Sequence, residues 1–213
     1  MKYKAVLFDM DGTLLDTLED LRDGVNLMLE RRGYPLRTTE EIRDFVGNGA
    51  RQLMQLALPA GTDGAEVESV LEEYREWYKV NYCIKTRPYD GVEEILNLLQ
   101  AQGIKSAVVS NKPDATARQL AEKFFPGLPA FGQRDEIPRK PAPDMVRNAL
   151  EVLGVAAQDA VYVGDSEVDV KTARNAGMPL IAVSWGFRTR EQLRAAGAEI
   201  IVDTAEELRQ LLQ

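Results

Sequence analysis

Two aspartates that follow the first apolar run of the sequence are the clearest candidates for chemistry. Asp9 directly follows residues 5–8, and Asp11 lies two residues later, so both side chains are on the same side of an extended segment. Gly12 permits a sharp turn after them. One carboxylate can bind a metal and attack a substrate while the other faces a leaving group. Crowded carboxylates repel one another and are tolerated best around a cation.

Two further polar groups follow later apolar runs. Residues 110–112 supply a hydroxyl, an amide and an ammonium group after the run 107–109. Asp165 follows another run, and Asp169 comes four residues later, a spacing that stacks both carboxylates on one helix face if the helix starts there. Taken singly, Asp-Gly-Thr at residues 11–13 is at least as well explained as a turn with a cap, and Gly-Asp-Ser at residues 164–166 as a strand-to-helix cap. Taken together, at the ends of separate apolar runs, they favour a functional site.

The chain has no histidine among its 213 residues. This absence excludes Ser-His-Asp and Cys-His nucleophile systems, histidine-ligated metals and histidine general bases. Cys83 is the only cysteine, so an intramolecular disulfide and a cysteine-based zinc site are excluded too. A metal in this chain is therefore expected to be a hard cation held by oxygen, and Mg²⁺ is the simplest candidate.

The charge balance bears on partners and location. The chain has 26 basic and 34 acidic residues, a net charge of −8, which argues against a nucleic-acid partner. No apolar run approaches the roughly 20 residues of a membrane span, so no membrane partner is expected. The apolar run at residues 5–8 is too short for a signal peptide, and we expect a cytoplasmic protein.

The elements that must position these residues follow from the apolar pattern. Five apolar runs are too short for helices and are typical of strands buried on both faces of a parallel sheet. Helical patterns lie between the later runs, so the sequence predicts a doubly wound α/β core. Ligands of such sheets bind beyond the carboxyl ends of the strands, where the candidate residues would converge. The predicted strands are residues 5–8, 107–109, 160–163, 180–183 and 200–202. The predicted helices between them are residues 91–102, 115–125, 142–153, 168–176, 190–196 and 206–212.

The alternation breaks once, after Asp16. About 70 residues follow with helical periodicity and no convincing strand, which is too long for one crossover connection. We therefore expect residues 16–86 to be an inserted helical domain, with residues 1–15 and 87–213 forming the α/β core. The predicted helices of the insertion are residues 18–32, 39–45, 48–58 and 64–82.

The candidate motifs resemble those of the haloacid dehalogenase-like hydrolase superfamily. The sequence DMDGTL at residues 9–14 resembles its first motif, and Ser-Asn at residues 110–111 resembles its second. Lys140 resembles the lysine of the third motif. Gly-Asp-Ser at residues 164–166, with Asp169, resembles the fourth. All four occur in order, and the resemblance spans the whole chain.

The helical insertion is similar to the small cap of that superfamily. The sequence FVGNG at residues 45–49 and the sequence RPYDG at residues 87–91 most resemble phosphoglycolate phosphatases. The resemblance thus implies a Rossmann-like core with an α-helical cap.

The resemblance also implies roles for the first aspartates. Asp9 would attack phosphorus and form an aspartyl-phosphate. Asp11 would protonate the leaving oxygen and then serve as the base for the hydrolytic water. Mg²⁺ would be held by Asp9, the backbone carbonyl of Asp11 and Asp165.

The remaining motif residues would bind the phosphate or support the site. Ser110 and Asn111 would bind phosphoryl oxygens, and Lys140 would offset charge in the transition state. Asp169 would contact the metal's surroundings or Lys140 rather than substrate.

The insertion carries a second group of candidates. Gly47, Asn48 and Gly49 lack the third glycine of a dinucleotide fingerprint and follow a helix, so the resemblance favours a loop that helps to choose the substrate. Arg51 and Lys112 are further cations for an anionic substrate. We interpret Lys112 as a solvated surface charge, whereas both interpretations of Arg51 stay open.

The function implied is a Mg²⁺-dependent phosphatase acting on a small phosphorylated metabolite, with 2-phosphoglycolate as first candidate. A pyrophosphatase, a sugar phosphatase or a phosphosugar mutase would use the same core. A receiver-type phosphoacceptor signalling domain also uses carboxylates, lysine and a hydroxyl, but it needs no lid of this length. A catalytically dead binding module is disfavoured because every motif position is filled. We expect a monomer or homodimer.

Overall fold

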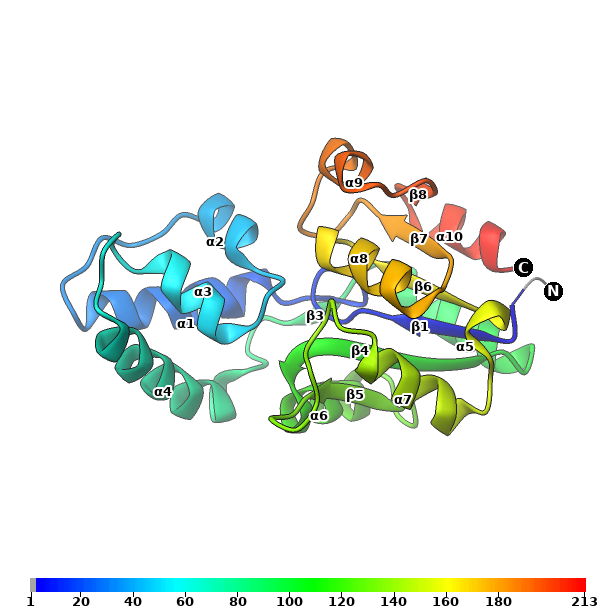
Figure 1. Cartoon of the computed structure of the whole chain (residues 1–213), viewed down its shortest axis with the longest axis horizontal. Coiled ribbons are helices and arrows are strands. Elements are labelled where there is room, and N and C mark those ends of the chain that lie inside the picture. Colours follow the sequence, from blue (N-terminus) through cyan, green and yellow to red (C-terminus); the bar gives the residue numbers. More distant parts are fainter. Residues whose placement is uncertain (1–2) are drawn as a thin grey trace. The chain divides into compact units, whose positions relative to one another are not determined.

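The chain forms two compact units in a computed structural model that describes residues 3–213 (Figure 1). One unit contains the residues up to Asp16 together with Pro88–Gln213, and the other contains Thr17–Arg87. These divisions lie one residue later in the chain than the sequence pattern predicts. The two chain crossings are marked by two short strands, β2 (Leu15–Asp16) and β3 (Arg87–Pro88), which form a two-stranded sheet.

The first unit is built on a six-stranded sheet with the order β5-β4-β1-β6-β7-β8. Every neighbouring pair in it is parallel. The central strands β1 and β6 are buried along their whole length, as an apolar run covered on both faces requires. The predicted doubly wound fold is therefore confirmed. The strands are β1 (Ala5–Phe8), β4 (Lys105–Pro113), β5 (Ala130–Gln133), β6 (Ala160–Gly164), β7 (Leu180–Val183) and β8 (Ile201–Val202).

Helices cover both faces of this sheet. In the view of Figure 1, α7 and α8 lie in front of the sheet, whereas α5 lies behind it and packs against β4 and α10. Apolar residues of α7 pack on alternate residues of β1, β4 and β6, which forms the main core of the unit. The helices are α5 (Val92–Ala101), α6 (Asp114–Phe124), α7 (Asp144–Leu153), α8 (Glu167–Ala176), α9 (Arg190–Ala196) and α10 (Ala205–Leu212), with a short 3₁₀ turn, η1 (Ala157–Asp159).

Two strands differ from the prediction. β5 escapes the sequence pattern because it is an edge strand of only four residues whose burial alternates, so it shows no continuous apolar run. β4 is longer than the predicted residues 107–109, because the polar residues that follow them remain in the strand up to Pro113. The extension matters for the site, since it keeps residues 110–112 on a rigid element.

The second unit consists of four helices. α4 packs against α1 and α3, and α2 packs against the same two helices. α1 and α4 approach closely at Gly24, where an added Cβ would lie 2.4 Å from the ring of Trp77. The helices are α1 (Leu18–Glu30), α2 (Thr39–Phe45), α3 (Ala50–Ala57) and α4 (Gly64–Asn81). None of the helices in residues 3–213 combines the length and apolar character needed to cross a bilayer.

One side chain ties the two ends of the helical unit together. Asp20, in the first turn of α1, is 2% exposed. Its carboxylate accepts hydrogen bonds from the backbone N–H groups of Ile84 (3.0 Å), Lys85 (3.0 Å) and Thr86 (2.8 Å). The hydroxyl of Thr86 donates a fourth, at 2.7 Å. The beginning and the end of this unit are thus fixed to each other by a fully hydrogen-bonded buried carboxylate.

Candidate active site

Three carboxylates meet at the carboxyl edge of the sheet. Asp9 follows β1, and its backbone N–H donates to the carbonyl of Val163 in β6 at 2.9 Å. Asp165 follows β6, and Asp169 lies in the first turn of α8. One oxygen from each of Asp9, Asp165 and Asp169 lies within 4.8 Å of the others. Residues 160 positions apart in the sequence therefore form one acidic cluster, as expected from adjacent parallel strands.

Lys140 lies inside this cluster. Its ammonium group is 2.8 Å from Asp9 Oδ1 and 2.8 Å from Asp169 Oδ1, and it donates to the hydroxyl of Tyr162 at 3.0 Å. The side chain is 1% exposed. The Tyr162 hydroxyl in turn lies 3.1 Å from the carbonyl of Val109, to which it donates. All three ammonium hydrogens thus have partners, which fixes the buried charge in place.

Asp169 has a structural task as well. Its Oδ2 accepts from the backbone N–H of Ser166 at 3.1 Å, and the Ser166 hydroxyl accepts from the N–H of Asp169, which completes a capping box at the start of α8. The helix begins at Glu167, so Asp165 precedes it. The condition for stacking both carboxylates on one helix face is therefore not met, although the two carboxylates do meet.

The carboxylate of Asp165 is held by two donors. The Thr13 hydroxyl donates to Oδ1 at 2.9 Å, and the N–H of Phe187 donates to Oδ2 at 2.8 Å. Two glycines make room for it. Gly12 has a φ of +83° and an added Cβ there would lie 2.3 Å from Asp165 Oδ2, while an added Cβ at Gly186 would lie 2.5 Å from the same side chain. Only glycine lets the backbone pass so close to this carboxylate at these positions.

Burial and mutual repulsion disturb the charges of the cluster. Burial, together with the charge of Asp169, raises the pKa of Asp165 to about 7. Burial and then Asp169 also raise the pKa of Asp9 well above its ordinary value, against the opposing effect of Lys140. Burial alone would lower the pKa of Lys140, but Asp169 and Asp9 outweigh it and raise that pKa. One lysine is shared by several carboxylates, so it stays charged and cannot neutralise all of them.

The donor set fits a hard divalent cation. Three carboxylates share one lysine, and a cation bound between them would relieve the repulsion that adds to burial in raising the pKa of Asp9 and Asp165. Oxygen atoms are the ligands that Mg²⁺ prefers. The third carboxylate of the observed cluster is that of Asp169. The ligand set that the family resemblance implies has the backbone carbonyl of Asp11 in the third place instead.

Comparison with known proteins places this geometry in a family. Residues 6–183 match the family of haloacid dehalogenase-like hydrolases. The chain is a haloacid dehalogenase-like hydrolase. A phosphoglycolate phosphatase of Xanthomonas campestris pv. campestris is 38% identical to it over 193 residues, which cover 87% of this chain and 85% of that relative. An N-acetylmuramic acid 6-phosphate phosphatase of Pseudomonas aeruginosa is 34% identical over 221 residues, covering 100% of this chain and 96% of that relative.

The fold of this hydrolase agrees with a solved structure. A Lactobacillus delbrueckii subsp. bulgaricus protein that is provisionally named a phosphoglycolate phosphatase superposes with a TM-score of 0.94 and 41% identity, covering 100% of this chain and 99% of that one. The expected resemblance is confirmed. The chain is a phosphoglycolate phosphatase-like member of the haloacid dehalogenase-like hydrolases, an enzyme of the phosphatase type.

The second-motif residues of this hydrolase lie beside Lys140. Ser110 and Asn111 are buried in β4. The amide of Asn111 donates to the backbone carbonyl of Lys140 at 3.0 Å, and the Ser110 hydroxyl accepts from the N–H of Lys112 at 3.2 Å. The structure therefore brings the second and third motifs together.

The interpretation of Lys112 as a solvated surface charge was wrong. Its side chain is 3% exposed, and its ammonium group lies 3.1 Å from Asp11 Oδ1. The reason is the length of β4, which keeps Lys112 in the sheet rather than in a loop. Asp11 itself is 16% exposed at its side chain, so this ion pair lies at the border between the buried cluster and solvent.

The candidates of the insertion belong to the helical unit. Gly49 has a φ of +81° and precedes α3, and Gly47 has a φ of +126°. Arg51 is half-exposed and pairs with Glu68 at 2.7 Å. Whether Gly47, Asn48, Gly49 and Arg51 contact substrate stays a prediction.

Sequence reasoning missed three side chains and one backbone group that contribute to the site. Tyr162 anchors Lys140, Thr13 holds Asp165, and Trp185 donates its indole N–H to the carbonyl of Thr13 at 3.1 Å. A signal existed for Tyr162, since a hydroxyl within a run of fully buried residues must find a polar partner. The backbone contribution of Phe187 has no such signal in the side-chain pattern.

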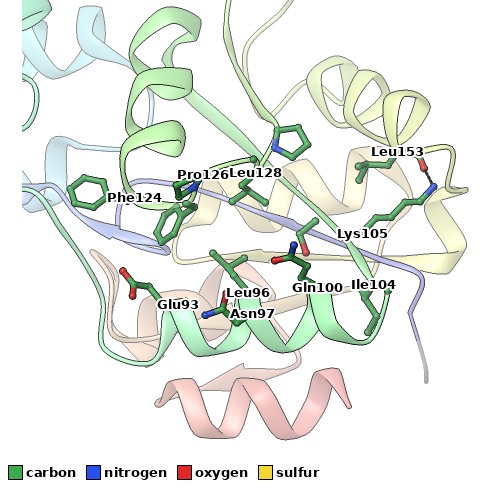
Figure 2. Close-up of a pocket in the computed structure, with 15 residues that line it drawn as sticks. Glu93, Leu96, Asn97, Gln100, Ile104, Lys105, Phe124, Pro126, Leu128 and Leu153 are labelled. Carbon is green, nitrogen blue, oxygen red and sulfur yellow. Dashed lines mark hydrogen bonds between the residues drawn. The ribbon is translucent and has the colours of Figure 1, made fainter.

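A separate cavity lies far from this chemistry along β4. It has a volume of about 540 Å³ and lies at the amino end of that strand, near Lys105, whereas Ser110 lies toward the carboxyl end. Figure 2 shows Leu96, Asn97 and Gln100 of α5 on one side of it and Leu128 on the other. The cavity lining contains none of the candidate residues named above.

Proposed function

We propose that this hydrolase is a Mg²⁺-dependent phosphatase that cleaves a small phosphomonoester, with 2-phosphoglycolate as the first substrate. The observation that carries the proposal is the cluster of Asp9, Asp165 and Asp169 with Lys140 buried among them. A strongly acidic cluster at the end of a parallel sheet suits a bound cation and the anionic phosphate that the cation attracts.

Mg²⁺ would be held by the side chains of Asp9 and Asp165 and by the backbone carbonyl of Asp11. When bound, the metal neutralises Asp9 against the incoming phosphate and orients the two groups. Lys140 and the backbone N–H of Met10 both bond Oδ1 of Asp9, so the carboxylate has one fixed orientation.

Asp9 and Asp11 divide the chemistry between them. An oxygen of Asp9 forms a bond to phosphorus as the bond between phosphorus and the leaving oxygen breaks, and Asp11 gives its proton to that oxygen. Asp11 then takes a proton from a water molecule that attacks the phosphorus. The bond between Asp9 and phosphorus breaks, and phosphate leaves.

The surrounding residues bind and stabilise the phosphoryl group. Ser110 and Asn111 offer donors to its oxygens. Lys140 offsets the negative charge that develops in the transition state. Asp169 holds Lys140, and its own position is fixed by the capping box with Ser166.

Two substrates have the strongest support. Relatives named phosphoglycolate phosphatase match at 38% identity, and a relative named N-acetylmuramic acid 6-phosphate phosphatase matches along the whole chain at 34%. Phosphate release from both compounds, from pyrophosphate and from a panel of sugar phosphates would rank them. A kcat/KM for 2-phosphoglycolate at least about 10-fold above the others is the expected result. A preference for any other compound contradicts the assignment of 2-phosphoglycolate.

Hydrolysis of p-nitrophenyl phosphate with and without EDTA tests the reaction class. We expect many turnovers per enzyme with Mg²⁺ and loss of activity with EDTA. A receiver-type domain would accept one phosphoryl group without repeated turnover, and a binding module would release no phosphate. We also propose that residues 17–87 act as the cap that selects the substrate, that the enzyme is cytoplasmic and that it is a monomer or homodimer.

A further inference from the structure

The ion pair of Lys112 with Asp11 has no part in the reaction steps above. Lys112 is nearly fully buried, and its ammonium group lies 3.1 Å from Asp11 Oδ1. Taking an ammonium group out of water is costly unless charged or polar partners compensate. A second lysine beside the reacting carboxylates therefore calls for a functional explanation.

We propose that Lys112 selects substrates whose leaving group carries an anionic group, such as a carboxylate, next to the ester oxygen. This inference rests on the proposed function, because it takes Asp11 as the residue that protonates the leaving oxygen. An atom that is hydrogen-bonded to Asp11 lies close to Lys112 as well. Lys112 therefore faces the leaving group, whereas Lys140 faces the phosphoryl group.

The other cations near the site contact groups other than Asp11. Lys140 binds Asp9, Asp169 and Tyr162. Arg188, which is 8% exposed, is bonded to Glu167 at 2.8 Å. Lys112 pairs with a carboxylate that is itself partly exposed, at the border of the site. An ammonium group has three donors, and an anion that comes within reach competes for them while the pair with Asp11 is kept.

The length of a small leaving group suits this arrangement. In 2-phosphoglycolate the carboxylate carbon is two bonds from the ester oxygen, so both groups lie within reach of one acid–lysine pair. A neutral leaving group of the same size would leave the ammonium group without that anion. Hydrogen bonds to charged groups are worth about 1.5–3 kcal/mol, a factor of roughly 10 to 100 in kcat/KM.

The test compares 2-phosphoglycolate with 2-hydroxyethyl phosphate, which has a neutral leaving group of similar size. The quantity is the ratio of the two kcat/KM values in the wild type, in Lys112→Met and in Lys112→Arg. We expect the ratio to fall roughly 10- to 100-fold in Lys112→Met, mainly through KM for 2-phosphoglycolate, and to fall less in Lys112→Arg. Lys105→Met, at the other end of β4, is the matched control and should keep the wild-type ratio.

The outcomes distinguish a failure of the inference about Lys112 from a failure of the proposed phosphatase function. An equal loss on both substrates in Lys112→Met means that Lys112 only positions Asp11, and it overturns the inference. A wild type that cleaves both substrates equally well also overturns it, while the phosphatase proposal stands. A wild type that cleaves neither overturns the proposed function itself.

A second measurement needs no variant. Glycolate should inhibit the wild type at least about 10-fold more strongly than ethylene glycol, because only glycolate offers a carboxylate to Lys112. Equal inhibition by the two contradicts the inference even if Lys112→Met does not fold.

Discussion

Each of the two compact units buries an aspartate, and the groups that surround the two carboxylates differ. Asp20 of the helical unit accepts four hydrogen bonds from Ile84, Lys85 and Thr86 and has a purely structural environment. Asp165 of the α/β unit is equally buried and also accepts hydrogen bonds, but it faces Asp9 and Asp169. Burial with hydrogen bonds fixes a fold, whereas burial beside like charges prepares a site for a cation and for chemistry.

The largest effect is expected at Asp9. Asp9→Asn should lower kcat at least about 1,000-fold while leaving the circular dichroism spectrum unchanged, because the amide oxygen is a poor nucleophile. Steady-state hydrolysis of p-nitrophenyl phosphate measures this loss. Retention of a tenth of the wild-type kcat, a loss of only about 1.4 kcal/mol, would rule out a covalent role.

Asp11→Asn should separate good and poor leaving groups. An alkoxide leaves badly unless it is protonated, whereas p-nitrophenolate leaves readily, and general acid catalysis contributes about 10²–10⁴-fold where it is needed. The loss should therefore be far larger for an alkyl phosphate. Single-turnover measurement of phosphoenzyme formation is required, since slow dephosphorylation masks the difference in steady state. Equal losses would mean that Asp11 only positions neighbouring groups.

The metal-free protein should lose stability as the pH rises. The pKa of Asp165 is about 7 in the folded chain, whereas the ordinary value of 3.8 applies in the unfolded chain. Between pH 3.8 and pH 7 the folded state therefore binds a proton that the unfolded state lacks. The melting temperature in EDTA should thus fall from pH 5 to pH 7.5, and less so in Asp165→Asn. Mg²⁺ at pH 7.5 should raise it in the wild type and much less in the variant. No response of the wild type to Mg²⁺ would argue against the metal site.

Asp20→Asn should lower the stability of the fold and leave kcat nearly unchanged, whereas Asp9→Asn should do the reverse. The amide can accept fewer of the four hydrogen bonds, which should cost about 1–3 kcal/mol of unfolding free energy. Urea denaturation measures this change. The kcat for p-nitrophenyl phosphate should stay near that of the wild type at temperatures where the variant is folded. A loss of kcat as large as that of Asp9→Asn would end the distinction between the two aspartates.

The smallest effects are expected at Asn48 and Arg51 of the helical unit. Arg51→Met removes an exposed ion pair with Glu68, so its cost in stability should be below about 1 kcal/mol. Substitution of Asn48 or Arg51 should change the ranking of substrates more than the hydrolysis of p-nitrophenyl phosphate. A uniform loss on all substrates would indicate that these two residues have only a structural role.

The sequence predicts the buried part of the fold well and its edges poorly. β1 and β7 begin and end where the apolar runs do, because both strands lie within the sheet. β5 lies at the edge and has no such signature. The motifs at Asp9 and Asp165 predict that separate strands converge, since parallel strands end at one edge.

The sequence does not show which polar side chains are buried or which groups they contact. Nothing in the residues around Lys112 indicates that β4 continues through them, so the sequence favours a lysine exposed to solvent. The apolar pattern includes Tyr162 as a strand residue, but it does not reveal that the Tyr162 hydroxyl anchors Lys140. Both errors concern long polar side chains in strands, whose partners come from distant parts of the chain.

The carboxylate of Asp20 has a consequence for how such enzymes can be recombined. This side chain joins the start of the helical unit to its end by hydrogen bonds within the unit. These hydrogen bonds do not involve the six-stranded sheet of the other unit. A chimaera that exchanges residues 17–87 for the corresponding segment of another such protein joins the two chains at two peptide bonds. If residues 17–87 select the substrate as proposed, this exchange transfers the substrate preference while Asp9 and Asp11 of the host stay in place.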